Sequence, residues 1–209
     1  ATDDVFISSS KSSTNFEGHS DGLLADGSDS TYGEMQTLIK FDLSSLPDCV
    51  VTTEAKLEIN ITNSSAGQYN LYLGASDWQE STATWSSVGG NNQQGALIKT
   101  IQPNSSGLMQ IELSSTSVLE NWLQNGNYGL VIASDGSTDG IDMTSNETGT
   151  GPVLKVAYDE ASDCNGDATV ELKSGETVTS IQANKDQSKM FFIDLESNAT
   201  GLTVIMSGG

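Results

Sequence analysis

The sequence predicts an all-β protein: an antiparallel β-sandwich with one short helix, followed by a small C-terminal β segment. Short stretches alternate apolar and polar residues with the period of two that a half-buried strand requires. Gly, Ser, Asn and Asp cluster between these stretches, as they do in the turns of β proteins. Only one stretch has the spacing of a capped helix. At 209 residues the chain is long enough for one sizeable core and a second, small one.

Residues 37–47 contain the most clearly patterned strand and its end. The positions expected to face the core are Thr37, Ile39, Phe41 and Leu43. Lys40 lies on the opposite, polar face, and Pro47 ends the strand because proline has no N–H to donate. Residues 55–62 alternate in the same way, so we expect the two strands to be antiparallel neighbours in a sheet with one solvent-exposed face.

The same alternation extends along most of the chain. Further strands are expected at 4–8, 69–75, 96–101, 108–113, 128–134, 140–144 and 152–158, and in the tail at 169–172, 177–181, 190–195 and 202–206. The helix follows residue 114. Ser117 and Glu120 have capping-box spacing, Trp122 lies on the apolar face, and Gly126 suits the C-terminal end. We expect this helix to plug the sandwich, with Trp122 in the core.

Acidic residues dominate the charge balance. The chain has 28 Asp and Glu against eight basic residues, for a formal net charge of −20. Nucleic acids and anionic membranes are bound through cations, so neither is an expected partner. No stretch approaches the ~20 apolar residues of a membrane-spanning helix. The acidity is typical of a solubility surface, and it also suits Ca²⁺, which takes several oxygen ligands.

Two acidic, glycine-bearing stretches are candidate calcium loops. The candidate metal ligands are Asp21, Asp26, Asp29, Asp135, Asp139 and Asp142. Neither stretch matches the EF-hand loop, whose ligands have a fixed twelve-residue spacing. The alternative for residues 21–29 is a solvated loop around a small apolar island, and for residues 135–142 a hairpin connection. The sequence leaves both alternatives open.

The two cysteines, Cys49 and Cys164, lie far apart in the sequence. The chain has a single histidine and no CxxC motif, which excludes a Cys/His zinc site of the usual spacing. We expect a disulfide, which would stabilise the fold by ~4–5 kcal/mol in the chain-entropy model. Two free thiols are the alternative.

The polar face of the sheet is the expected binding surface. The candidate ligand-binding residues are Lys40, Lys56, Lys99, Lys155, Tyr72 and Trp85. If the strands bring the lysines together, they form a cationic patch suited to a uronic-acid polymer, and an exposed indole gives a sugar ring a surface to stack on. Alternatively, the lysines pair with carboxylates across strands, and Trp78 and Trp85 are core residues whose indole N–H meets a loop carbonyl.

The sequence contains no recognisable catalytic motif. A hydrolase needs a nucleophile with its base, two positioned carboxylates, or a metal with an open coordination position. His19 stands in a Gly-His-Ser-Asp loop without a nucleophile elbow, and we expect it to be an exposed loop residue. We therefore do not expect an enzyme.

Four segments resemble, in the same order, the DNRLRE family of secreted bacterial β-sandwich modules. These segments are KFDLSSLP (40–47), TEAKLEINIT (53–62), DWQESTATW (77–85) and ENWLQNGNYGLVI (120–132). The resemblance covers residues 3–158 and implies a jelly-roll-like sandwich appended to a polysaccharide-degrading or other surface enzyme. Some members act as carbohydrate-binding modules, including on alginate lyases. The tail at 171–209 is similar to the opening strands of a bacterial pre-peptidase C-terminal domain.

These resemblances imply a module at 1–159, a linker at 160–168 and a partial pre-peptidase C-terminal-like segment at 169–209. We expect a non-catalytic, monomeric, extracellular module of a larger secreted bacterial enzyme, covalently linked to its catalytic domain. It would bind a polysaccharide, such as the uronic-acid polymer alginate, and carry structural Ca²⁺. The alternative is a structural or adhesive spacer of a secreted protease or surface protein, without a sugar site.

Overall fold

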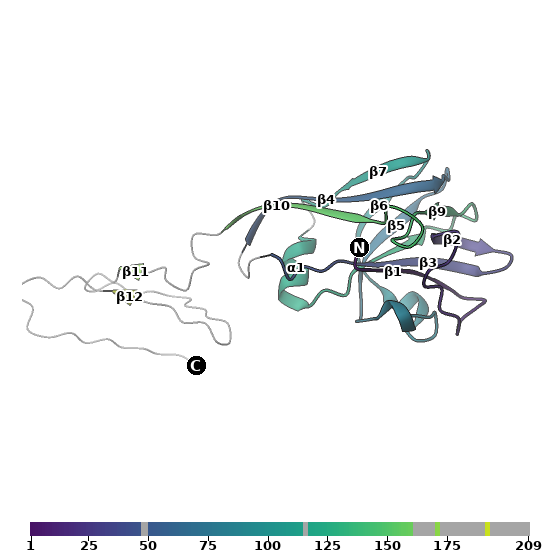
Figure 1. The fold of residues 1–209 in the computed structure, drawn as a ribbon, viewed down its shortest axis with the longest axis horizontal. Helices are drawn as coiled ribbons and strands as arrows, with labels where there is room; N and C mark the ends of the chain where they lie inside the picture. Colours follow the sequence, from purple (N-terminus) through teal and green to yellow (C-terminus); the bar gives the residue numbers. More distant parts are fainter. Residues whose placement is uncertain (47–49, 115–116, 161–169, 172–190, 193–209) are drawn as a thin grey trace, which may run out of the picture. The chain divides into compact units, whose positions relative to one another are not determined.

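The computed structural model describes residues 1–46, 50–114, 117–160, 170–171 and 191–192. By compactness the chain divides into two units, one of Ala1–Pro47 with Val51–Asp159 and the other of Asp48–Val50 with Glu160–Gly209. The first unit is an all-β sandwich with one short helix, which confirms the predicted fold class (Figure 1). None of the helices in the described part of the chain is long and apolar enough to cross a membrane.

Within the second unit, the described residues form a minimal β pair. Strand β11 (Val170–Glu171) pairs in parallel with β12 (Phe191–Phe192). The strands predicted at 177–181 and 202–206 lie outside the described residues, and so do Cys49 and Cys164. The disulfide therefore stays a prediction.

One layer of the sandwich, here called sheet A, contains five strands. In spatial order they are β1 (Asp3–Ser8), β3 (Gly33–Lys40), β8 (Leu130–Ser134), β5 (Tyr69–Gly74) and β6 (Gln94–Ile101). All four pairings between them are antiparallel. The other layer, sheet B, contains β10 (Val153–Glu160), β4 (Val50–Asn63), β7 (Gly107–Glu112) and β9 (Ile141–Met143).

Strand β2 (Leu23–Asp29) links the two sheets. Its first half pairs with β9 of sheet B, and its second half pairs with β3 of sheet A. The prediction of a loop is therefore wrong at these residues. Asp and Gly are depleted in strands, but that preference is weak compared with pairing and burial in the folded protein. Leu23 and Leu24, expected as an isolated apolar island, are buried.

Two predictions about strand neighbours are also wrong. Strands β3 and β4 lie in different sheets, although their sequences suggested a pair. Residues 135–140 connect β8 of sheet A to β9 of sheet B, so they are not a hairpin turn. Alternation with a period of two identifies the faces of a strand, but it carries no information about which strand lies beside it.

The main core lies between the two sheets and is closed by helix α1 (Val118–Asn125). Trp122 of this helix is buried with its ring centroid 6.5 Å from that of Phe41, which confirms its predicted core position. Figure 1 shows α1 at one end of the sandwich. The helix ends as predicted, with the Gly126 N–H donating to the Trp122 carbonyl. The predicted capping box is not formed: Ser117 has a left-handed φ of 52° and its side chain makes no capping hydrogen bond.

A second core covers the outer face of sheet A. The segment at 75–93, here called the covering segment, packs Trp78, Ala83 and Val88 against Val5, Leu38 and Val131 of the sheet. Trp78 is 5% exposed and its Nε1 donates to the Tyr128 carbonyl at 3.0 Å, as predicted for a core tryptophan. Strands β1, β3 and β8 of sheet A are therefore largely buried on both faces, and the expected solvent-exposed face of β3 is wrong at Leu38.

His19 lies in the long connection between β1 and β2, and its ring packs in an aromatic cluster. Its ring lies edge-on to Phe6, Phe16 and Tyr32 at centroid distances of 5.2, 5.8 and 6.1 Å. Its side chain is 22% exposed, so the expectation of an exposed loop residue is wrong. The acidic, glycine-rich sequence around it gave no indication of this packing.

The second core makes a prediction for Leu38, whose side chain is fully buried. Leu38→Ala is expected to lower the free energy of unfolding by ~2–5 kcal/mol, because it removes apolar burial and leaves a cavity. Leu108→Ala, at a leucine that is 64% exposed, is the matched control and should change it by less than ~0.5 kcal/mol. Urea denaturation followed by tryptophan fluorescence measures both. Equal losses would contradict a buried outer face of sheet A.

Candidate functional site

Lys40, the first of the predicted ligand-binding lysines, is held by the covering segment. Its Nζ lies 2.7 Å from Asp77 Oδ1 and 4.9 Å from the centroid of the Trp78 ring. It also donates to the Trp78 carbonyl. These contacts join the end of β3 to the beginning of the covering segment. They leave the ammonium group little capacity to bind a ligand.

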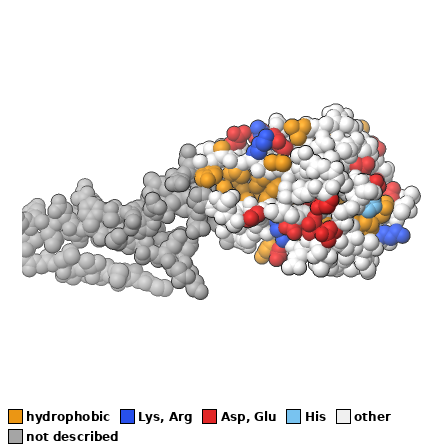
Figure 2. All heavy atoms as spheres, in the orientation of Figure 1, with side chains coloured by type: hydrophobic (Ala, Val, Ile, Leu, Met, Phe, Trp, Pro, Cys, Tyr) orange, Lys and Arg blue, Asp and Glu red, His pale blue; other side chains and the backbone are white. Residues whose placement is uncertain are grey.

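Lys56 and Lys155 lie on sheet B and pair with carboxylates. Lys56 Nζ is 3.1 Å from Glu112 Oε1 and 3.2 Å from Glu54 Oε1, and these contacts raise the pKa of Lys56. Lys155 Nζ is 2.8 Å from Glu58 Oε1, and its hydrogen bond lowers the pKa of Glu58. The structure thus shows the cross-strand pairing that was the alternative to a binding patch. Figure 2 shows basic side chains with acidic ones beside them.

Lys99 is exposed on β6, at the edge of sheet A. It forms no ion pair with the residues that the structure describes. The four lysines are therefore divided between the two sheets, and they do not make up one cationic patch.

Tyr72 and Trp85, the two predicted aromatic ligands, both lie on the outer face of sheet A. Both are half-buried and pack against the second core. Gly90 lies against the Trp85 indole so closely that an added Cβ would be 2.5 Å from Nε1. Among the described residues, none accepts a hydrogen bond from that Nε1. Each of the two rings thus combines a fixed position with an exposed part.

A network of amides and a carboxylate runs beside these rings. Gln36 is fully buried, and its Nε2 donates to Glu34 Oε1 at 3.1 Å and to Asn91 Oδ1. Gln94 Nε2 donates to the same Asn91 oxygen at 3.2 Å. Asn91 Nδ2 lies 3.4 Å from Glu34 Oε2. The network therefore joins β3 to the end of the covering segment and the start of β6.

A second polar chain lies two strands away on the same face. Thr100 donates to Asn70 Oδ1 at 2.8 Å, and Asn70 Nδ2 donates to the Tyr72 hydroxyl at 3.1 Å. Asn70 and Gln36 both pair with Ala133, so their side chains share one face. Strand spacing places them roughly 10 Å apart. The two networks and the two rings form what we call the sheet A site.

The sequence pointed to only part of this site. Tyr72 and Trp85 were candidates, but the polar members were not: Glu34, Gln36, Asn70, Asn91, Gln94 and Thr100. Gln36 and Asn91 are 55 positions apart, and only the fold brings them together. One signal was present in the sequence: the amide-rich run at 91–94 follows Trp85 closely.

The predicted calcium ligands serve mainly as turn and strand residues. Asp26 accepts a hydrogen bond from the Ser28 N–H at 2.8 Å. Asp29 accepts the N–H groups of Thr31 and Tyr32, and these bonds lower its pKa. Burial, with the nearby charges of Asp21 and Asp26, raises the pKa of Asp142. Asp135 and Asp139 are exposed.

A different set of carboxylates converges, in a way that the sequence did not indicate. Oxygen atoms of Asp4, Glu80 and Glu147 all lie within 4.8 Å of one another. Asp4 is 1% exposed, and burial together with the Glu147 charge raises its pKa to about 7. Figure 2 shows acidic side chains gathered over β1. Of the residues described, these three are the set whose geometry could hold a metal ion.

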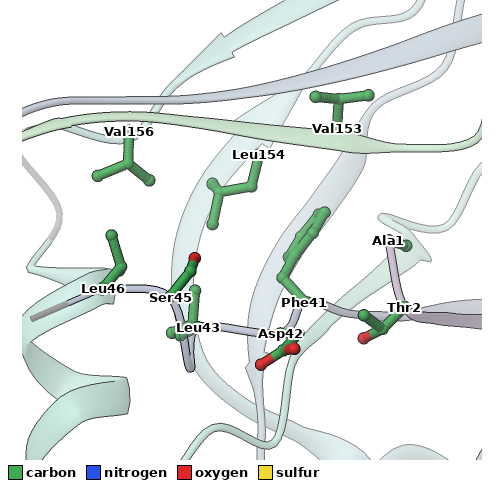
Figure 3. Close-up of a pocket in the computed structure, with 10 residues that line it drawn as sticks. All are labelled: Ala1, Thr2, Phe41, Asp42, Leu43, Ser45, Leu46, Val153, Leu154 and Val156. Carbon is green, nitrogen blue, oxygen red and sulfur yellow. The ribbon is translucent and has the colours of Figure 1, made fainter.

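A cavity of about 390 Å³ lies between the end of β3 and strand β10 (Figure 3). Phe41, Leu43 and Leu46 line one side, and Val153, Leu154 and Val156 line the other. Apolar side chains make up most of the lining, which also includes Thr2, Asp42 and Ser45. A sugar carries hydroxyls around its ring and needs matching donors and acceptors, which the sheet A site supplies in greater number.

Comparison with known protein families matches residues 1–158 to carbohydrate-binding module family 96. The match covers most of the chain, and the chain belongs to this family. No match was found among curated proteins. The coarse prediction of a carbohydrate-binding β-sandwich is thereby confirmed.

The raised pKa of Asp4 predicts a pH-dependent stability. Without metal, Asp4 protonates near pH 7 in the folded protein but near pH 4 when unfolded. Between these values the folded state binds more protons, so the free energy of unfolding should fall as pH rises from about 4 to 7. Asp4→Asn should make that fall shallower, whereas Asp135→Asn, at an exposed aspartate, should not. Urea denaturation in EDTA between pH 4 and 8 measures this, and identical slopes would contradict it.

Proposed function

We propose that this module binds a polysaccharide through the sheet A site and is itself non-catalytic. The observation that carries the proposal is the position of Tyr72 and Trp85, two half-exposed rings fixed beside a network of amide and carboxylate groups. Sugar rings bind through apolar C–H faces and polar hydroxyls, so a site for them combines aromatic surface with hydrogen-bonding groups. The family of the chain supports the same function.

We further propose that the module belongs to a larger secreted bacterial enzyme. Its contribution would be proximity: a bound module keeps the linked catalytic domain near an insoluble or gel-like substrate and raises its effective concentration. The resemblance to secreted DNRLRE-type modules and to a pre-peptidase C-terminal domain supports this context. The alternative function is that of a structural or adhesive spacer without a sugar site.

The binding proposal predicts retardation in affinity gels that contain the cognate polysaccharide. Trp85→Ala and Tyr72→Ala should each weaken retardation about tenfold or more, because each removes aromatic surface from the site. Tyr158→Ala, at an exposed tyrosine on β10, is the matched control and should bind like the wild type. A screen of alginate, pectin, chitin and neutral glucans covers the main classes. If no polymer retards the wild type, the spacer function is favoured instead.

We also propose that the module holds a structural Ca²⁺ ion, at Asp4, Glu80 and Glu147. Calcium prefers several oxygen ligands, carboxylates above all. These three carboxylates are close enough to share one cation, and Asp4 is buried among like charges. A bound cation would offset that repulsion and the cost of burying the charge.

The calcium proposal predicts a chelator-sensitive melting temperature. Calcium should raise the Tm of the wild type and EDTA should lower it, because an ion that binds only the folded state stabilises it. Asp4→Asn should remove the response, and Asp29→Asn, which alters a turn away from the carboxylate cluster, should keep it. Differential scanning calorimetry measures both variants. A wild-type Tm that is indifferent to EDTA and to calcium would contradict the proposal.

A further inference from the structure

The sequence contains several aspartates that are followed directly by glycine, and the fold leaves one of these pairs open to a reaction of the backbone itself. We propose that Asp135 is a site of spontaneous isoaspartate formation, a covalent modification that reroutes the main chain through the aspartate side chain. This inference goes beyond the proposed function and does not depend on sugar binding. The Asp-Gly pairs are Asp21-Gly22, Asp26-Gly27, Asp135-Gly136 and Asp139-Gly140.

The reaction joins the backbone nitrogen of the glycine to the side chain of the aspartate before it. The Gly136 nitrogen attacks Cγ of the protonated Asp135 carboxyl, and the carboxyl hydroxyl leaves with the amide proton as water. Water then opens the resulting five-membered imide. Opening at Cγ restores aspartate, whereas opening at the main-chain carbonyl of Asp135 gives isoaspartate. One water leaves and one returns, and nothing is oxidised or reduced. Glycine favours the attack because it has no Cβ and the freest backbone.

Both reacting groups of the Asp135-Gly136 pair are free of contacts. The two residues are exposed, and a Cβ added to Gly136 would meet no atom within 4 Å. Within the described part of the chain, the Gly136 N–H has no hydrogen-bond acceptor and the Asp135 carboxylate has no donor. The Asp135 N–H donates to the Gln68 carbonyl at 2.9 Å, which leaves the side chain and the following peptide group unrestrained. No contact has to break before the nitrogen reaches Cγ.

The attacking nitrogen is already committed in the two pairs of strand β2 and the turn before it. The Gly22 N–H donates to the His19 carbonyl at 2.9 Å, and the Gly27 N–H donates to the Ser137 carbonyl at 2.9 Å. Gly22 is also buried, and a Cβ there would lie 2.2 Å from the Met143 carbonyl oxygen. Either pair can react only after the backbone opens locally.

Asp139-Gly140 gives the sharpest comparison, because it lies in the same connection and its aspartate is also exposed. Here the peptide group between the two residues is held. The Asp139 carbonyl accepts from the Tyr69 hydroxyl and, at 3.4 Å, from the Ser137 hydroxyl. A Cβ added to Gly140 would lie 2.8 Å from Asp26 Oδ2. The rotation that brings a backbone nitrogen onto Cγ is therefore hindered in this pair.

Asn-Gly pairs react by the same route, with ammonia as the leaving group. In Asn125-Gly126 the Gly126 N–H donates to the Trp122 carbonyl at 3.1 Å, so its nitrogen is also committed. Asn165-Gly166 lies outside the described residues. A test must therefore locate isoaspartate at each position separately.

The modification would disturb the connection between the two sheets. An isoaspartyl linkage adds one carbon to the main chain immediately before Ser137. The Ser137 carbonyl accepts from Ser134 Oγ at 2.7 Å and from the Gly27 N–H at 2.9 Å. Gly67 packs so closely on Ser137 that an added Cβ would lie 2.2 Å from its Oγ. A longer main chain at Asp135 would shift these contacts, so the aged protein should have a lower Tm.

The test compares the four Asp-Gly pairs in the folded and in the urea-unfolded wild type. Both samples are aged at about pH 5, where a fraction of each aspartate is protonated. Electron-transfer fragmentation of proteolytic peptides distinguishes isoaspartate from aspartate at each position. Asp135→Glu blocks the reaction, because glutamate would have to form a six-membered imide. Asp21→Glu is the matched control, since it changes an exposed aspartate before a held glycine. Thermal melts before ageing establish that both variants are folded.

In the folded protein, isoaspartate should accumulate at least about tenfold faster at Asp135 than at Asp21, Asp26 or Asp139, which must first open locally. Urea should remove this difference. Ageing should lower the Tm of the wild type and of Asp21→Glu more than that of Asp135→Glu. Equal rates at the four pairs in the folded protein would overturn the proposal. A preference for Asp135 that persists in urea, or an unreactive Asp135 in the folded protein, would overturn it too. An equal loss of Tm in both variants would overturn the proposed effect on the connection.

Discussion

The packing of Trp78 against the outer face of sheet A is the contact on which the rest of the molecule depends. Its indole is buried over Leu38 and Val131, donates to the Tyr128 carbonyl, and has Lys40 above its ring. These contacts fasten the covering segment to the sheet at its start. The segment then extends across the sheet. It contains Trp85 and Asn91, so its path places both side chains on the outer face of the sheet. One buried side chain thus determines both the second core and the location of the sheet A site.

The strongly negative charge of the chain gives the few cations structural roles. With 28 acidic residues and eight basic ones, a lysine within a sheet readily finds a carboxylate on a neighbouring strand. Lys56 and Lys155 do so on sheet B, and Lys40, at the end of β3, pairs with Asp77 of the covering segment. The proposed sheet A site correspondingly contains amides, hydroxyls, aromatic rings and the Glu34 carboxylate, and no lysine. Asp4 lies close to two other carboxylates, where either a proton or a cation would relieve the repulsion.

Much of the fold could be predicted from the alternation of apolar and polar residues, because a period of two indicates which side chains of a strand are buried. It identified most strands of the sandwich, and the apolar face of the predicted helix correctly placed Trp122 in the core. Strand partners could not be predicted, since they depend on long-range pairing. Strand β2 was missed because its Asp and Gly residues favour turns locally. In the site, Tyr72 and Trp85 were visible as aromatic residues at polar positions. The network between Gln36 and Asn91 was not, because no local pattern links residues so distant in the chain.

The sheet A site is tested most directly by a ¹H–¹⁵N NMR titration of the protein with an oligosaccharide from the polymer that retards it. The indole resonance of Trp85, assigned through Trp85→Phe, and the side-chain amides of Asn91 and Gln94 report on the sheet A site. If the sheet A site binds the sugar, these signals shift together and saturate at one ligand concentration, while the Gln110 amide on sheet B stays unchanged. Shifts confined to Gln110 and the lysine-bearing face of β4 and β10 would place binding on sheet B and contradict it.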